Sequence, residues 1–352
     1  MTGGDKTLKL YEITVKPRSG FGTPLKGDTI FGHFCWQVAH DATILNGGLE
    51  KWVACYAEKP FVVFSSAWPK FYESDTGKAQ YILKRPDLPD SVLFRSSGMD
   101  RQTQIKERKK NKRKKWIGIG EDLCIVLGDV NYFTGKDLLE KAKNQATHET
   151  RRQMRRRDKP DFCTSFGQPH NTINRWTMTT GEGKFAPFSE TTNFYYPETE
   201  LVIFVLVDEA ATSMERVQRA MERIGKRGYG KNASTGLGRF DLAECDELDL
   251  PVADSPNACY TLAPVVPQRG LFSESYFTPF IRFGKHGERL ANSQNPFKSP
   301  VAMADEGAVF VPRDLTVFEK PYIGLGISGL SKSMPQTVGQ GYSFYLPFKL
   351  EM

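Results

Sequence analysis

The stretch IGKRGYGKNASTGLGRFDL, from Ile224 to Leu242, combines closely spaced glycines with basic residues that could bind phosphate. Gly225, Gly230 and Lys231 fit the G-x-x-x-x-G-K part of a nucleotide-binding P-loop, but Asn232 stands where Ser or Thr would hold Mg²⁺. A P-loop runs from a strand into a helix, so that phosphate meets a helix N-terminus. Here the apolar pattern predicts helix, loop, strand, and a phosphate would face the negative end of the helix dipole. The order therefore argues against an ATPase.

The same glycine-rich loop suits the sugar-phosphate chain of a nucleic acid. Glycine lets the backbone approach a ligand closely, and we expect the N–H groups of Gly228, Gly230 and Gly236 to do so. Tyr229 could offer a face for base stacking. The polar side chains expected to bind RNA are Lys226, Arg227, Lys231, Asn232 and Arg239. A glycine-rich turn that only lets the chain cross the sheet is the alternative.

Histidines are the first candidates for catalysis on RNA. A nuclease that activates the 2′-hydroxyl would use a histidine as general acid or base, and His33 and His170 are candidates. A surface or structural histidine is the alternative for His33, and His170 could touch RNA without acting as a catalyst. Six scattered cysteines without a C-x-x-C pair indicate reduced thiols in a cytoplasm and give no zinc signal. We expect no metal and no cofactor.

Two short windows hold the positive charge of the chain. Residues 101–115 contain nine Lys/Arg and one Glu, and residues 151–159 contain six Lys/Arg and one Asp. The whole chain carries +7, so the remainder is mildly acidic. Such windows are typical of polyanion contacts, because each neutralised phosphate releases counterions, although a solvated loop is the alternative. The expected contacts are Arg108, Lys109, Lys110, Lys112, Arg113, Lys114, Lys115 and Trp116, of which Trp116 could stack on a base or anchor the loop.

The apolar spacing places the glycine-rich loop in a mixed α+β domain. It predicts strands at 9–17, 61–66, 200–208 and 236–244, helices at 28–40 and 212–225, and a pair of strands within 173–196. Asp28 is the expected N-cap of the first helix, and Thr212-x-x-Glu215 is a capping-box signal for the second. The order β-α-β-β-α-β is that of ferredoxin-like domains, which RNA-recognition domains also use.

The length of 352 residues is enough for two domains. We expect a first domain at 1–250, with a polar, basic insertion at about 70–165 that contains a helix over 136–157, and a second domain at 251–352. Strands are expected at 259–267 and 276–284. A second glycine-rich loop near the C-terminus carries Lys332, Gln340 and Tyr342, which could flank an RNA cleft or belong to a plain turn. No apolar run approaches the 18 residues of a membrane span.

Four segments, in this order, resemble the RAMP superfamily of CRISPR-associated proteins. GTPLKGDTIFGHF (22–34) is similar to the family's first turn and helix, and HNTINRWTMTTGEGKFAPFSE (170–190) to its N-x-I-x-R hairpin, with Asn171 and Arg175. GYGKNASTGLGRF (228–240) resembles its glycine-rich loop. GLGISGLSKSMPQTVGQGYSFYLPF (324–348) resembles the closing segment of one subgroup, the crRNA 5′-handle-capping subunits of type III-A (Csm) effector complexes.

This resemblance implies two ferredoxin-like domains, a bound crRNA and no nuclease activity. It also implies contacts with the large polymerase-like signalling subunit and the backbone subunits, a target RNA nearby, and a cytoplasmic prokaryotic location without membrane contact. The large basic insertion departs from compact family members. It could be a thumb that bends the guide at the handle–spacer junction, or a separate contact with RNA. The alternative function is a RAMP endoribonuclease that processes precursor crRNA or cuts target RNA. Backbone RAMP subunits cut with a loop aspartate and a metal, so Asp28 would then be a candidate.

Overall fold

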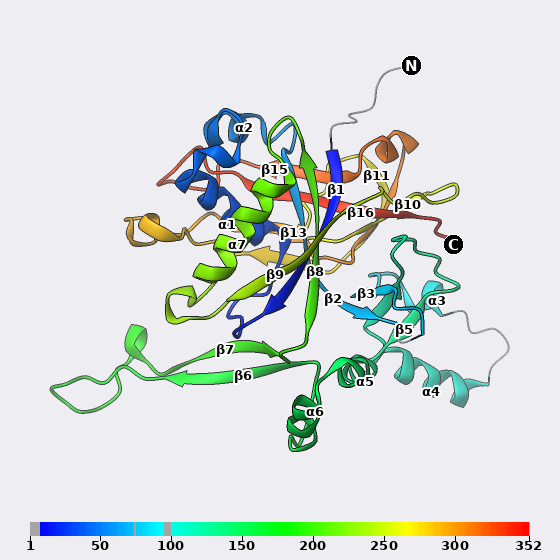
Figure 1. Cartoon of the computed structure of the whole chain (residues 1–352), viewed down its shortest axis with the longest axis horizontal. Coiled ribbons are helices and arrows are strands. Elements are labelled where there is room, and N and C mark those ends of the chain that lie inside the picture. Colours follow the sequence, from blue (N-terminus) through cyan, green and yellow to red (C-terminus); the bar gives the residue numbers. More distant parts are fainter. Residues whose placement is uncertain (1–7, 74, 95–99, 352) are drawn as a thin grey trace.

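The structure is a computed structural model that describes residues 8–73, 75–94 and 100–351 (Figure 1). Its centre is a seven-stranded sheet in the order β5-β4-β3-β2-β8-β1-β9, in which neighbouring strands are antiparallel. The strands of this sheet are β1 (Leu8–Pro17), β2 (Val62–Tyr72), β3 (Ala79–Lys84), β4 (Trp116–Ile119), β5 (Asn131–Phe133), β8 (Glu200–Asp208) and β9 (Phe240–Leu248).

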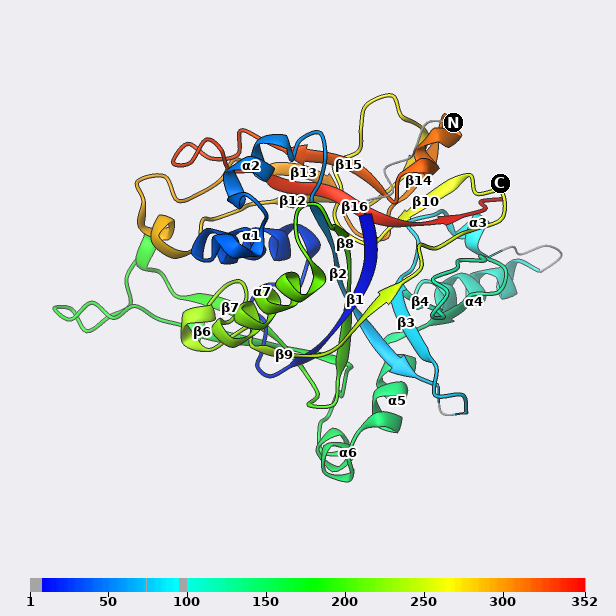
Figure 2. The same ribbon diagram turned by 45° about the horizontal axis from the view of Figure 1, so that its top comes forward.

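The expected order of strand, helix, two strands, helix and strand is present. It consists of β1, α1 (Gly27–His40), β2, β8, α7 (Met214–Arg227) and β9, and its four strands lie together as β9-β1-β8-β2. The two helices lie side by side on one face of the sheet (Figure 2). β1, α1 and β8 agree with the expected ranges to within about one residue, because each has a clear apolar period. The loop between α7 and β9 is the glycine-rich loop of the sequence.

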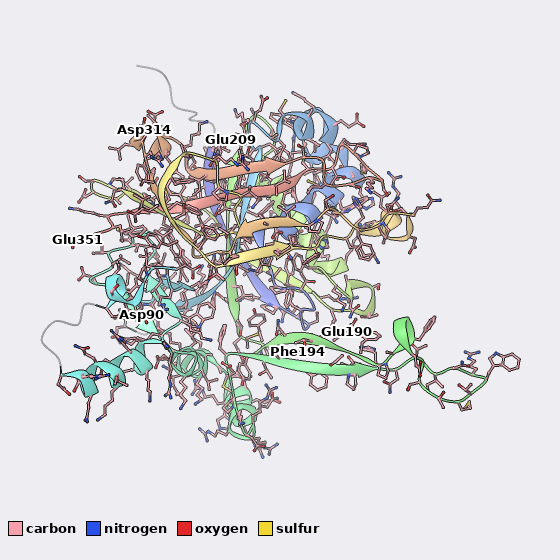
Figure 3. All side chains as sticks on the ribbon, turned by 180° about the vertical axis from the view of Figure 1, so that it is seen from behind. Asp90, Glu190, Phe194, Glu209, Asp314 and Glu351 are labelled. Atoms are coloured by element: carbon pink, nitrogen blue, oxygen red, sulfur yellow. The ribbon has the colours of Figure 1, made fainter. Side chains whose placement is uncertain are left out.

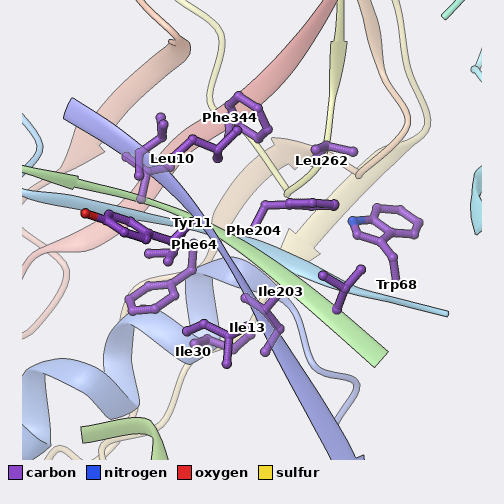
Figure 4. Close-up of a cluster of buried hydrophobic side chains, with 14 of the residues drawn as sticks. Leu10, Tyr11, Ile13, Ile30, Phe64, Trp68, Ile203, Phe204, Leu262 and Phe344 are labelled. Atoms are coloured by element: carbon purple, nitrogen blue, oxygen red, sulfur yellow. The ribbon is translucent and has the colours of Figure 1, made fainter. Parts of the chain in front are cut away.

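The central strands of the seven-stranded sheet are buried on both faces. Strand β8 is buried from Leu201 to Asp208, as its run of seven apolar residues predicts. Figure 4 shows the two layers: Ile30 of α1 lies below the central strands, whereas Phe344 and Leu262 of the C-terminal part lie above them. Phe204 of β8 and Phe344 have ring centroids 6.4 Å apart. One hydrophobic core therefore includes residues from both sides of the boundary expected near residue 250.

The C-terminal part is built mostly of strands. A five-stranded sheet has the order β11-β14-β10-β16-β15, and a separate pair joins β12 to β13. The bounds are β10 (Ala258–Thr261), β11 (Phe272–Tyr276), β12 (Pro279–Arg282), β13 (Val301–Ala304), β14 (Val309–Pro312), β15 (Tyr322–Ile327) and β16 (Gly339–Phe348). Between residues 251 and 351 the structure has short 3₁₀ helices and no α-helix. The second ferredoxin-like domain is therefore not confirmed.

The expected insertion begins as part of the central sheet, because β3, β4 and β5 extend it beyond β2. The described residues of this region also form four helices, two before β4 and two after β5: α3 (Asp90–Leu93), α4 (Arg101–Asn111), α5 (Gly135–Gln145) and α6 (His148–Arg155). The single helix expected over 136–157 is wrong. α5 ends before Ala146, and the Thr147 hydroxyl starts α6 by accepting a hydrogen bond from Thr150 N–H, so the chain turns there. α5, α6 and the base of the following hairpin enclose a small separate core.

A two-stranded hairpin leaves the body after α6 and lies outside the central sheet (Figure 1). Its strands are β6 (Cys163–His170) and β7 (Phe188–Tyr195), paired in register from Cys163–Tyr195 to His170–Phe188. The first of the two strands expected within 173–196 is therefore wrong, because β6 ends before that range, whereas β7 lies inside it. Residues 171–187 form the outer loop. Its Thr-rich segment has the composition of a strand, but among the described residues no strand pairs with it.

Two predicted helix caps are wrong. α1 starts one residue before Asp28, with Lys26 as its N-cap residue, so the Asp28 side chain is inside the first turn. α7 has Ser213 as its N-cap residue without a side-chain cap bond. The Thr212 hydroxyl instead donates to the carbonyl of Ile44 at 2.6 Å. Both side chains have tertiary partners that the local sequence does not reveal. In addition, α2 (Gly48–Cys55) follows α1.

Candidate nucleic-acid interface

The glycine loop, residues 228–239, has a compact backbone with many left-handed positions. φ is positive at Gly228, Gly230, Asn232, Gly236 and Gly238. Gly238 is the most constrained, since a Cβ there would lie 2.1 Å from the Tyr229 carbonyl oxygen. The spacing of the glycines therefore reflects the path of the loop itself.

The backbone N–H groups expected to bind phosphate are already used within the protein. Gly228 N–H donates to the Ile224 carbonyl at 2.8 Å, and Gly236 N–H donates to the Ala233 carbonyl at 3.0 Å. Gly230 N–H donates to His33 Nε2 at 3.0 Å. The expectation of a backbone phosphate cradle at these glycines is therefore wrong, and binding by this loop has to come from its side chains.

Tyr229 is a structural residue, which corrects its predicted role as a stacking face. Its side chain has 0% exposure, and its hydroxyl donates to the Pro24 carbonyl at 3.0 Å. The same hydroxyl accepts from Lys26 N–H at 3.3 Å, and the ring lies 4.8 Å from the His33 ring. A buried tyrosine with both hydrogen-bonding roles satisfied ties the glycine loop to the turn before α1.

His33 is partly buried, and it serves as a hydrogen-bond acceptor. Burial lowers its pKa from 6.5 to about 4, against the opposing effect of Glu288. The ring is therefore neutral near pH 7, with the Nε2 lone pair directed at Gly230 N–H. Of the two readings of His33, the structure favours the structural one, because a proton on Nε2 would break this bond.

Glu190 of the hairpin connects β7 to the glycine loop. Its carboxylate lies 2.7 Å from Lys231 Nζ and accepts a hydrogen bond from the Asn232 amide. These two partners lower the pKa of the Glu190 carboxyl. Lys231 N–H also donates to the Thr23 hydroxyl at 2.9 Å. The first turn, the hairpin and the glycine loop thus meet at one place.

Four predicted cations in or beside the glycine loop are exposed. Lys226 and Arg227 occupy the last turn of α7, where positive charge complements the helix dipole, and Arg239 lies directly before β9. Lys231 is exposed as well, but its ammonium group forms an ion pair with the Glu190 carboxylate. We refer to Lys226, Arg227, Lys231 and Arg239 as the cationic rim.

The hairpin carries exposed aromatic side chains next to this rim. Phe166, Phe188 and Phe194 lie on its strands, and Trp176 in its outer loop is 96% exposed. Figure 3 shows the hairpin extending from the body, with Phe194 nearer its base. Sequence reasoning missed this surface, because aromatic residues in strands usually belong to a core. These aromatic side chains are exposed because the hairpin lies outside both large sheets.

Asn171 and Arg175 are exposed in the outer loop of the hairpin, beyond the end of β6. Figure 1 shows this loop pointing away from the glycine loop, so the two predicted groups of RNA contacts are separated. His170 lies at the end of β6, where its ring stacks on Phe188 and its Nε2 is 3.9 Å from Glu190. Of the histidines close to the cationic rim, His170 is therefore the one that is accessible from solvent.

Asp28 forms a bidentate ion pair with Arg282 of β12. The two N–O distances are 2.5 and 2.8 Å, and the Asp28 side chain is nearly buried. The pair joins the first turn of α1 to the C-terminal part. Both carboxylate oxygens thus accept hydrogen bonds from Arg282.

The second glycine-rich loop does not form a matching RNA site. Gln340 is fully buried, and its amide donates to the Phe64 carbonyl at 2.7 Å and accepts from Phe64 N–H at 2.9 Å. The Tyr342 hydroxyl is buried against the carbonyls of Tyr56 and Ala57. Lys332 alone is exposed. The predicted RNA contacts of Gln340 and Tyr342 are therefore wrong, because both residues join β16 to the first part of the chain.

The first basic window forms α4 and the turn that follows it. Arg108, Lys109, Lys110, Lys112, Arg113 and Lys115 are exposed, and Lys114 lies over the rings of Phe94 and Tyr132. Trp116 is half-buried in β4 opposite Phe133 and packs against both neighbouring cores. Of the two possibilities for Trp116, the structure supports the anchor.

Among the described residues, one group of carboxylates is close enough to suggest a metal: Glu12, Glu244 and Asp246. The Lys70 ammonium occupies this place, 2.8 Å from Glu12 and 3.3 Å from Glu244. Burial alone would lower the pKa of Lys70, but the hydrogen bond and charge of Glu12 raise it, which keeps the cation in place. Among the residues that the structure describes, no helix is long and apolar enough to cross a membrane.

Two solved structures share the fold over nearly the whole chain. A chain in the crystal structure of a Csm1-Csm4 cassette in complex with pppApA has a TM-score of 0.53 and 15% identity, with 97% of this chain and 99% of that chain covered. A chain in the crystal structure of a Csm3-Csm4 subcomplex of the type III-A CRISPR-Cas interference complex has a TM-score of 0.53 and 12% identity, with 96% and 99% covered. No protein-family model matches the sequence, and no curated protein gives a significant match.

Proposed function

We propose that the chain is a non-catalytic subunit of a type III CRISPR RNA-guided effector complex, and that it binds and caps the 5′ handle of the crRNA. One observation carries the proposal: the cationic rim and the aromatic hairpin meet at Glu190, on a chain with a fold found in Csm4-containing structures. The rim offers charge to phosphates, and the hairpin offers faces to bases.

The proposed partners follow from the composition of the two similar structures. Csm4 is common to both structures, beside Csm1 in one and beside Csm3 in the other. By analogy, the chain bridges the large polymerase-like subunit to the backbone subunits, with the target RNA nearby, in cytoplasmic antiviral defence. We also propose that the chain divides into two domains between residues 250 and 251.

The non-catalytic part of the proposal is supported by the engagement of two candidate residues. His33 is neutral and accepts a hydrogen bond from Gly230, and both oxygens of Asp28 are held by Arg282. His170 remains the residue on which the endoribonuclease alternative would depend, because it is partly exposed next to the rim.

The test is RNA binding by the purified full chain. End-labelled CRISPR-repeat RNA containing the handle is compared with a scrambled RNA of equal length, with and without Mg²⁺, on native and denaturing gels. We expect tighter binding of the handle RNA and no cleavage. Lys226→Ala with Arg227→Ala should weaken handle binding at least about tenfold, because two charge-assisted contacts are lost. Arg269→Ala with Lys320→Ala removes the same charge from exposed positions of the C-terminal part and serves as the control.

Equal binding of handle and scrambled RNA would overturn the capping role. Discrete cleavage that is lost in His170→Ala would establish the endoribonuclease alternative.

A further inference from the structure

The basic arm, residues 101–115, comprises α4 and the turn before β4. No residue of α4 is buried, so tertiary packing contributes little to this helix. Its exposed cations also repel one another at helical spacing, as between Lys106 and Lys110, which destabilises an isolated helix. Within α4 the sole acidic residue is Glu107, 3.8 Å from Lys110. An anion bound outside the chain would relieve this repulsion.

The fold nevertheless holds the basic arm at a defined place. The Asp100 carboxylate caps α4 by accepting from the N–H groups of Gln102 and Thr103. At the other end, the Asn111 carbonyl accepts from Arg85 at 3.3 Å, and Lys115 N–H donates to the Phe133 carbonyl at 3.1 Å. A helix tied to the body at its C-terminal end but without a buried face presents its charges to the solvent.

A pocket of about 530 Å³ lies between α4 and α3. Arg108, Lys109 and Lys112 contribute to its lining, and Ser91 adds a hydroxyl. Two carboxylates also line it, but Asp90 is 3.2 Å from Arg85 and Glu107 is near Lys110. The arm thus contributes three cations to a space that the apolar side chains of Phe94 and Ile105 also line, and an anionic group can enter beside these cations.

We propose that the basic arm is a second RNA-binding surface, which holds the phosphate backbone of an RNA strand by charge and without reading bases. This inference rests on the proposed function, since it assumes that RNA is the polyanion at hand. Figures 1 and 2 place α4 and the glycine loop at opposite sides of the central sheet, so the arm contacts a different segment from the one at the cationic rim.

The composition of the arm favours a nucleic acid over an acidic protein. Protein interfaces depend on a few buried aromatic or apolar anchors, and the exposed apolar side chain on α4 is Ile105 alone. Backbone binding of RNA needs only closely spaced cations. Exposed aromatic side chains gather instead on the hairpin, so stacking and backbone charge are divided between two surfaces.

The test measures the affinity of the full chain for a scrambled single-stranded RNA over a range of salt concentrations. The arm variant combines Lys109→Gln, Lys112→Gln and Arg113→Gln, and the control variant combines Arg269→Gln, Lys320→Gln and Lys349→Gln. All six positions are exposed, and both variants lose two lysines and one arginine, so their net charges are equal. Thermal melting checks that both variants remain folded.

We expect the arm variant to lower the slope of log K against log salt by about 2, which corresponds to about three phosphate contacts on single-stranded RNA. The control should retain nearly the full slope. The preference for handle over scrambled RNA should persist in the arm variant, because that preference reports on the cationic rim. Loss of preference in Lys226→Ala with Arg227→Ala would separate the two surfaces, because the arm variant keeps that preference.

Identical salt slopes in the arm and control variants would overturn the inference while leaving the capping role standing. So would failure of the wild-type chain to bind scrambled RNA. If the arm variant keeps its RNA affinity but no longer joins the other subunits in a reconstituted complex, the arm is a protein contact and the inference is wrong.

Discussion

At the scale of single residues, the glycine loop depends on side chains that point inward. His33 and Tyr229 fix its backbone to α1 and to the turn before it, while Lys226, Arg227 and Arg239 stay in solvent. The residue types predicted an RNA-binding loop, but they could not show which polar groups the fold itself would use.

The low pKa of His33 makes the stability of the protein depend on pH. The unfolded chain binds a proton near pH 6.5, whereas the folded chain binds it only near pH 4, so stability is lost as pH falls through this range. Between pH 7 and pH 5 we expect His33 to account for a loss of about 2 kcal/mol in the free energy of unfolding.

Urea unfolding at the two pH values measures this loss. In His33→Gln the loss should be smaller by about the same 2 kcal/mol, because no group then titrates at this position. His148→Gln, at an exposed position, should behave like wild type. The same pH dependence in His33→Gln and wild type would contradict the assignment.

Gly238 tests whether the glycines serve the path of the loop. Gly238→Ala places a Cβ against the Tyr229 carbonyl at a φ of 71°, and we expect a loss of about 2–4 kcal/mol in stability. Gly236→Ala, with a φ of 97° but open space around the Cβ, should cost only about 1 kcal/mol. Equal costs in chemical denaturation would show that steric fit at Gly238 is unimportant.

At the scale of elements, the hairpin β6–β7 has the most exposed apolar surface for its size. We predict that Trp176→Ala leaves the melting temperature unchanged, because the side chain makes little contact with the protein. The same change should weaken crRNA binding by about 1–3 kcal/mol through the loss of one stacking contact. Phe283→Ala, in which the lost ring is 74% exposed on the C-terminal part, is the matched control. Equal RNA affinity of the two variants would remove the hairpin from the RNA site.

Elements with a strong apolar period were predictable, and those defined by partners were not. α1, α7 and β8 follow from the spacing of their buried residues. β6 and β7 have mixed exposure on both faces, and the sequence placed the first of them too late. The break between α5 and α6 depends on Thr147, whose hydroxyl also donates to Glu198, a contact 51 residues away.

The same distinction holds for the candidate site. Exposed cations such as Arg227 could be recognised from composition, because nothing in the chain needs to contact them. Gln340 and Tyr342 were misread, since a buried amide or hydroxyl in a glycine-rich segment looks like a ligand contact until its tertiary partners are known. Asp28 shows the same effect, because its partner Arg282 is 254 residues away.

At the scale of the whole molecule, buried charges join α1 to the C-terminal part. Lys26 Nζ binds Asp305 and lies 2.7 Å from Glu306, next to the Asp28–Arg282 pair. Arg282→Met leaves the Asp28 carboxylate nearly buried without a partner, and we expect a loss of about 3–5 kcal/mol in stability. The exposed Arg18–Asp241 pair is a control, since Arg18→Met should cost at most about 1 kcal/mol.

Chemical denaturation monitored by tryptophan fluorescence measures both losses. Asp28→Asn combined with Arg282→Met should recover part of the stability, because the double variant no longer buries a lone charge. No recovery would mean that Arg282 acts through packing on Phe280, over which its guanidinium lies at 4.8 Å.

β16 has a consequence for how the protein is made on the ribosome. This strand pairs with β10 and β15, and its Gln340 satisfies both backbone groups of Phe64 in the central sheet. Translation produces it after every element that it contacts, so the nascent chain carries an uncovered apolar sheet until residue 348 has left the exit tunnel. Synthesis that stalls before this point would leave an aggregation-prone intermediate, in which the glycine loop is complete but the central sheet lacks the cover that β16 provides.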